Sequence, residues 1–204
     1  MDFREDNREV RIAAGCSLAC PFCTLGEGRE GFAAADVIAG RIDLPEADRY
    51  IVLAGNLIDE RHVPLVARLK AAGAAAIDLY AHSGVRNPAA LKALADAGMT
   101  GIRLVLPAAT REDLASMTSG RGSLKTAATL LAGAAALGLE VTLEVPITGK
   151  NAGLTADTVA RAARLSPLRM VVLSFVSMTT PDGKPECWDP LLAKESVQAT
   201  NAFC

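Results

Sequence analysis

Short apolar runs alternate with segments of helical periodicity along most of the chain, with a repeat of roughly thirty residues. The run RYIVLAGN at 49–56 is continuous enough to form a strand that is buried on both faces. The segment ERHVPLVARLKAAG at 60–73 spaces its apolar residues as a helix does and ends at Gly73, a usual residue at helix C-termini. This alternation predicts parallel strands joined by right-handed helical crossovers.

The full pattern predicts an α/β fold with parallel strands. Asn87 and Thr155 stand where helix N-caps are expected, and His62, inside a helix beside a charged residue, is expected at the surface. The predicted strands are 9–15, 49–56, 75–83, 101–109, 139–148 and 169–177. The predicted helices are 34–42, 60–73, 87–98, 123–138, 155–165 and 191–203.

Composition favours a single folded core. The 204 residues are 50% hydrophobic, with a mean hydropathy of +0.26, so the chain can bury a sizeable interior. The 21 basic and 23 acidic side chains give a net charge of −2, which argues against nucleic acid as a partner. No apolar run reaches the length of a membrane span and the N-terminal segment has no signal core, so we expect a cytoplasmic protein without a membrane partner. Residues 1–178 are expected to form the core, and 179–204 a turn and helix of the same domain.

Three of the five cysteines, Cys16, Cys20 and Cys23, lie in one loop after the first predicted strand. Parallel α/β folds carry their chemistry at the carboxyl ends of the strands, which is where this loop begins. Cys187 and Cys204 are distant, so the five do not form an even disulfide framework. Reduced thiols that bind a metal or take part in redox chemistry are therefore expected.

The spacing CxxxCxxC can place three sulfurs around one compact inorganic cluster. A 4Fe-4S cluster normally takes four cysteines, so three would leave one iron without a protein ligand. A catalytic zinc site keeps an open position for substrate in the same way. The alternative is a zinc or structural iron–sulfur site that Cys187 completes.

The sequence resembles the radical S-adenosylmethionine (SAM) superfamily in this loop, where Phe22 is the aromatic residue just before the last cysteine. The resemblance extends over nearly the whole chain and implies a partial, TIM-like barrel of six βα units. It implies a 4Fe-4S cluster on Cys16, Cys20 and Cys23, with SAM chelating the open iron. A one-electron donor such as flavodoxin or ferredoxin would reduce the cluster, and cleavage of SAM would give a 5'-deoxyadenosyl radical that abstracts hydrogen from a substrate.

The resemblance also implies SAM contacts at the strand ends. Ala54, Gly55 and Asn56 stand where the family has Gly-Gly-Glu-Pro, whose backbone and acid receive the SAM ammonium group. Gly55 still allows a close approach of the backbone. Asn56 still offers an acceptor oxygen but lacks the charge of the carboxylate. Val105 and Pro107 replace a serine and an aspartate that touch SAM in the peptide-modifying branch of the family.

Four more residues are assigned to the SAM site. Arg121, ahead of a Gly-Ser helix start, resembles the arginine that pairs with the SAM carboxylate in the peptide-modifying branch. Glu144 stands where the family places a polar residue for the ribose hydroxyls, and its alternation with apolar neighbours allows it to face the barrel interior. Ser83 and Ser177 end the third and sixth strands. His82, beside Ser83, is either a substrate-side or SAM-carboxylate contact or a polar loop residue.

The segment around Arg121 favours a peptide or a peptide-derived natural product as substrate. Two alternatives stay open. One is a radical SAM enzyme that acts on a small molecule, for instance in cofactor biosynthesis. The other is a cluster-binding protein that has lost SAM chemistry, which Asn56, Val105 and Pro107 permit.

Overall fold

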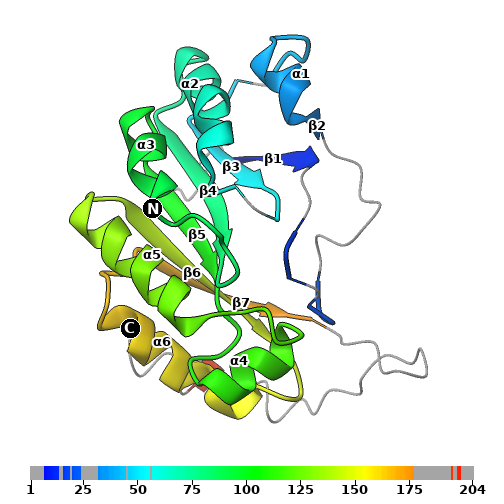
Figure 1. Cartoon of the computed structure of the whole chain (residues 1–204), viewed down its shortest axis with the longest axis vertical. Helices are drawn as coiled ribbons and strands as arrows, with labels where there is room; N and C mark the ends of the chain where they lie inside the picture. The colour runs from blue at the N-terminus through cyan, green and yellow to red at the C-terminus, as the bar shows by residue number, and fades with distance from the viewer. Residues whose placement is uncertain are drawn as a thin grey trace.

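A computed structural model of the chain describes residues 7–13, 16–18, 20–23, 32–44, 46–55, 57–176, 194 and 197–198. The strands in these ranges are β1 (Asn7–Ala13), β2 (Phe32–Ala33), β3 (Arg49–Leu53), β4 (Ala76–His82), β5 (Gly101–Val105), β6 (Glu140–Ile147) and β7 (Met170–Phe175). They form one sheet in the order β2-β1-β3-β4-β5-β6-β7, in which all neighbours run parallel (Figure 1). The carboxyl ends of all these strands therefore meet at one edge of the sheet.

Most of the helices lie along the outer side of the curved sheet (Figure 1). They are α1 (Ala34–Ile38), α2 (Val63–Ala71), α3 (Ala90–Asp96), α4 (Arg111–Met117), α5 (Leu124–Ala136) and α6 (Thr155–Ala163), with short 3-10 turns η1 (Glu60–His62) and η2 (Ala152–Leu154). The longest, α5, begins after Ser123, whose side chain accepts a hydrogen bond from the Thr126 amide and satisfies one free N–H of the first turn. No helix in the described ranges combines the length and apolar character that crossing a membrane requires.

The hydrophobic core lies between the sheet and these helices, and it is aliphatic. Ile77 and Leu79 on β4, like Leu130 on α5, are fully buried. Burial of each such side chain stabilises the fold by about 2 kcal/mol before the entropic cost of folding is counted. This packing fixes the strands, and with them the positions of the loops at their carboxyl ends.

The parallel α/β architecture predicted from the sequence is confirmed, and two further elements are present. Strand β2 adds a short edge strand, in which Phe32 pairs with Ile12 of β1. Helix α4 lies between β5 and α5, where no element was predicted. It begins after Thr110, whose side chain accepts a hydrogen bond from the Asp113 amide, so its capping signal was present in the sequence.

Three local predictions were wrong. Asn87 does not cap a helix with its side chain, because α3 begins one turn later and the Asn87 carbonyl accepts from the Ala90 amide. Thr155 is the first residue of α6, and its hydroxyl donates back to the Asn151 carbonyl. His62 is buried rather than exposed, since η1 turns its ring inward to within 3.1 Å of the Leu57 carbonyl.

Of the predicted helix 191–203 only residues 194, 197 and 198 are described, all as helical. The predicted C-terminal part of the domain, 179–204, therefore lies mostly outside the described residues.

An ion-pair network joins the strands at their amino ends. Arg49 on β3 donates to Asp78 on β4 at 2.7 Å and to Glu140 on β6 at 3.0 Å. Arg169, just before β7, also approaches Glu140, at 3.2 Å. Asp78 is only 5% exposed, and burial raises the pKa of its carboxyl against the opposing effect of Arg49. The network therefore links the amino ends of the strands, at the end of the sheet opposite the cysteine loop.

We expect Arg49→Met to lower the free energy of unfolding by about 3 kcal/mol, because Asp78 would stay buried without its cation. Lys92→Met is the matched control, since it removes an exposed pair with Asp96 on one helix and should cost no more than about 0.5 kcal/mol. Urea unfolding followed by circular dichroism measures both values. Equal losses in the two variants would contradict a structural role for the network.

Candidate functional site

The cysteine loop packs against the carboxyl ends of β3 and β4. A Cβ atom at Gly55, just past β3, would lie 2.3 Å from Cys16 Cβ and 2.5 Å from Cys16 Cα, so only glycine allows this approach. Ser17 donates through its hydroxyl to the carbonyl of Gly84, just past β4, at 2.9 Å. The loop then turns through a hydrogen bond from the Cys23 amide to the Cys20 carbonyl. These contacts hold the loop on two neighbouring strands.

The three thiols influence one another electrostatically. Burial, followed by the neighbouring Cys16 and Cys23 sulfurs, raises the pKa of Cys20 to about 12. Burial also raises the pKa of Cys16, while the Leu18 amide, 3.4 Å from the Cys16 sulfur, lowers it. A positively charged ligand beside Cys16 and Cys20 would favour their thiolate forms against this effect.

The three thiols do not converge on one point. No trio of His, Cys, Asp or Glu side chains within the described ranges could hold a single metal ion. In a four-iron cluster each cysteine binds a different iron, so its ligands need not converge on one point. Three thiols on one loop are therefore compatible with a cluster.

A cavity of about 70 Å³ lies beside the three cysteines. Two strands contribute polar side chains to its wall, His82 and Tyr80 from β4 and Glu144 from β6. His82 pairs in register with Val105, and Val105 pairs with Glu144, so these three residues form one row across the sheet. The predicted residues that the cavity brings together are Cys16, Cys20, Cys23, Phe22, Gly55 and Glu144.

Glu144 is held by three donors. Its Oε2 accepts from the Tyr80 hydroxyl at 2.5 Å and from Arg103 Nε at 2.8 Å, and its Oε1 accepts from the Ser174 hydroxyl at 3.1 Å. The Arg103 guanidinium also lies 5.7 Å from the centroid of the Tyr80 ring, within cation–π range. Glu144 is 8% exposed, and these donors hold its carboxylate in place at the cavity wall.

Arg121 and Ser83 do not line the cavity but support the cysteine loop and the start of α5. Exposed Arg121 donates to the Ser17 carbonyl at 3.4 Å. Ser83 is fully buried, and its carbonyl accepts from the Ser123 amide at 2.9 Å. The Ser83 hydroxyl has no hydrogen-bond partner among the described residues.

The remaining predicted residues are either buried supports or undescribed. Phe22 is 7% exposed and packs with Met117 and Cys20 beneath the loop. Ala54 is buried in the main core. Asn56 and Ser177 lie outside the described residues, so their assignments stay predictions.

Tyr80, Arg103 and Ser174 were not predicted, and His82 was left undecided. His82 is 5% exposed and its Nε2 lies 3.4 Å from the Cys16 sulfur. Burial lowers the pKa of His82 to about 4, so the ring is neutral near pH 7. Tyr80 and His82 alternate on β4, which places them on the same face. This alternation is the sequence signal that could have placed Tyr80 and His82 together in the site.

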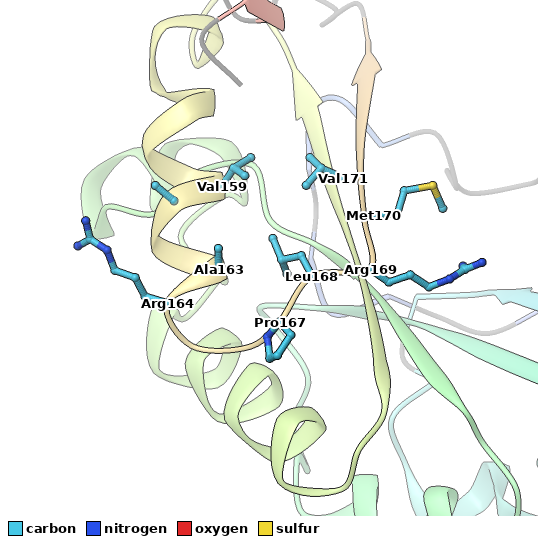
Figure 2. Close-up of a pocket in the computed structure, with 9 residues that line it drawn as sticks. Val159, Ala163, Arg164, Pro167, Leu168, Arg169, Met170 and Val171 are labelled. Atoms are coloured by element: carbon cyan, nitrogen blue, oxygen red, sulfur yellow. The ribbon is translucent and has the colours of Figure 1, made fainter. Parts of the chain in front are cut away.

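A larger groove of about 590 Å³ lies between α6 and the start of β7, at the amino end of that strand (Figure 2). Val159, Leu168 and Val171 line it, with Arg164 and Arg169 at its sides. Its described lining residues include no acid, thiol or histidine. The cavity beside the cysteines is therefore the better candidate for chemistry.

No family model and no curated protein matches the sequence. Solved structures match the fold. Coproporphyrinogen III oxidase (HemN) from Escherichia coli, a radical SAM enzyme, aligns over 98% of this chain and 52% of its own, with a TM-score of 0.67 and 15% identity. Streptococcus suis SuiB bound to S-adenosylmethionine aligns over 98% of this chain and 48% of its own, with a TM-score of 0.73 and 13% identity.

The structure of SuiB bound to the precursor peptide SuiA also matches. It aligns over 98% of this chain and 46% of its own, with a TM-score of 0.70 and 12% identity. The chain spans about half the length of HemN and SuiB. The protein therefore has the parallel partial-barrel fold found in radical SAM enzymes, as the resemblance of its cysteine loop implied.

Proposed function

We propose that the protein binds a 4Fe-4S cluster on Cys16, Cys20 and Cys23, binds SAM beside it, and acts as a radical SAM enzyme. The observation that carries the proposal is a cavity at the carboxyl edge of the sheet whose wall holds all three cysteines and Glu144. Held by Cys16, Cys20 and Cys23, the cluster would supply the single electron needed for reductive cleavage of SAM to methionine and 5'-deoxyadenosyl.

The residues of this chain would bind and orient SAM. Gly55 lets its backbone approach the cysteine loop without a side chain in the way. Glu144 keeps acceptor capacity at Oε1, which has one donor among the described residues, and this atom would accept from a ribose hydroxyl. Arg121, already docked on the loop through Ser17, would pair with the SAM carboxylate. Asn56 would accept from the SAM ammonium group.

Other parts of the site would exclude water from it. Phe22 and Met117 form a buried apolar support under Cys20. Val105 and Pro146 add apolar wall beside Glu144. An apolar wall with a few fixed polar groups is typical of sites that bind a small molecule in one orientation.

For the substrate we propose a peptide or peptide-derived natural product, with flavodoxin or ferredoxin as the electron donor. The similarity to SuiB, which has been solved bound to its precursor peptide, supports this class. The similarity to HemN and to methylornithine synthase (PylB) supports the small-molecule alternative. PylB aligns over 96% of this chain and 62% of its own, with a TM-score of 0.68 and 15% identity. Val105 in the cavity wall permits the other alternative, a cluster protein without SAM chemistry.

Anaerobic reconstitution should load about four irons and four sulfides per chain. Alanine at Cys16, Cys20 or Cys23 should abolish loading, because each thiolate holds a different iron. Iron, sulfide and zinc analysis measures the result. A protein that takes up zinc instead, and loses it in Cys187→Ala, would contradict the proposal.

Gly55→Ala should reduce cluster loading at least tenfold, because the new Cβ would overlap the Cβ and Cα of Cys16 and displace the loop. Gly153→Ala is the matched control, since a Cβ there meets nothing within 4 Å among the described residues. Visible absorption of the reconstituted proteins compares the two. Equal loading in both variants would show that the loop does not depend on its contact with Gly55.

The reduced protein should cleave SAM slowly to 5'-deoxyadenosine without substrate. Arg121→Ala should lower this rate about tenfold at limiting SAM, because a charge-assisted hydrogen bond to the carboxylate is lost. Arg164→Ala, at the distant groove, should not change it. Product is measured by chromatography with dithionite as reductant, and absence of 5'-deoxyadenosine above a Cys20→Ala control would favour the cluster protein without SAM chemistry.

A further inference from the structure

We propose that His82 is a positioning residue that donates an N–H···S hydrogen bond to Cys16 and thereby raises the reduction potential of the cluster. The proposal rests on the proposed function, because it requires a cluster on the cysteine loop. It concerns a side chain of β4 that the assignments above leave without a role. The contact is the 3.4 Å separation of His82 Nε2 and Cys16 Sγ.

The hydrogen-bond partners of the ring fix which nitrogen carries the proton. The Gly84 amide donates to His82 Nδ1 at 3.0 Å, so Nδ1 is the acceptor. In a neutral imidazole the other nitrogen, Nε2, then carries the hydrogen. With the hydrogen on Nε2, the 3.4 Å contact makes His82 the donor and the Cys16 thiolate the acceptor. The ring also contacts the backbone of Gly55.

The same arrangement argues that His82 is not itself a metal ligand. A histidine that binds a metal through Nε2 donates its other ring N–H to an acceptor. Here Nδ1 faces the donor amide of Gly84, and two hydrogens cannot occupy that contact. Ligation through Nε2 would therefore break the bond with Gly84, whereas donation to the sulfur preserves it.

Two glycines make room for this contact. The absence of a Cβ at Gly55 lets Cys16 approach the strand ends, as described above. A Cβ at Gly84 would lie 2.5 Å from Leu18 Cδ2 and 3.2 Å from His82 Nδ1, so a larger residue there would push the loop and the ring apart. With Ser17 bonded to the Gly84 carbonyl, the ring and the sulfur are held together from both sides.

A hydrogen bond to a ligand sulfur withdraws electron density from it and stabilises the reduced cluster, which carries more negative charge. Removal of the donor should therefore make the cluster harder to reduce. We expect His82→Phe to lower the ratio of reduced to oxidised cluster about tenfold at a fixed ambient potential, which corresponds to a midpoint about 59 mV more negative for one electron. His82→Gln, which retains an N–H donor, should recover much of the loss.

The test is a redox titration of reconstituted protein followed by electron paramagnetic resonance, with iron content measured for every variant. His62→Phe is the matched control, because it removes the only other histidine of the sequence, also buried but bonded to Leu57. An unchanged midpoint in a loaded His82→Phe protein overturns the inference and leaves the proposed function intact. A parent protein that forms no cluster overturns both.

A second measurement decides the matter if His82→Phe does not load a cluster. With both histidines labelled with nitrogen-15, pulsed electron paramagnetic resonance of the reduced parent should detect a nitrogen coupled to the cluster through the hydrogen bond. The coupling should persist in His62→Phe. Absence of any histidine coupling in the loaded parent would overturn the inference.

Discussion

The contact between Cys16 and Gly55 determines where the cysteine loop lies. It depends on the pairing of β1 with β3, in which Val10 is opposite Val52 and Arg11 opposite Leu53, so the two strands end at nearly the same level. Their loops then meet, and backbone atoms approach within a distance that no side chain would permit. The parallel register of β1 and β3 thus brings the cysteine loop against the end of β3, so that two strands form the site.

Strand β4 connects the site to the rest of the sheet interior. Its alternate residues Asp78, Tyr80 and His82 each meet a different partner, in order from the amino end to the carboxyl end: Arg49, Glu144 and Cys16. The intervening Ile77, Leu79 and Ala81 are fully buried in the apolar core. One strand therefore carries three polar interactions on one face and the core on the other, which is the period-2 pattern of a strand.

The sequence predicted what depends on neighbouring residues and missed what depends on distant ones. The longer strands were predicted because an apolar run or an alternation of apolar residues is a local signal, and the cysteine loop because its motif is contiguous. The network of Tyr80, Arg103 and Glu144 joins three strands, and no local pattern indicates that partnership. Strand β2 is similar, because two residues form a strand only by pairing with β1.

The fixed position of Glu144 constrains what the cavity can bind. Its carboxylate would have to break bonds with Tyr80 and Arg103 in order to move, so its field in the cavity is preorganised. In the same row, Val105 offers no polar group and the His82 ring is directed at the Cys16 sulfur. A ligand in this cavity therefore meets the fixed Glu144 carboxylate on the β6 side and the cysteine sulfurs on the other, and this asymmetry would fix its orientation.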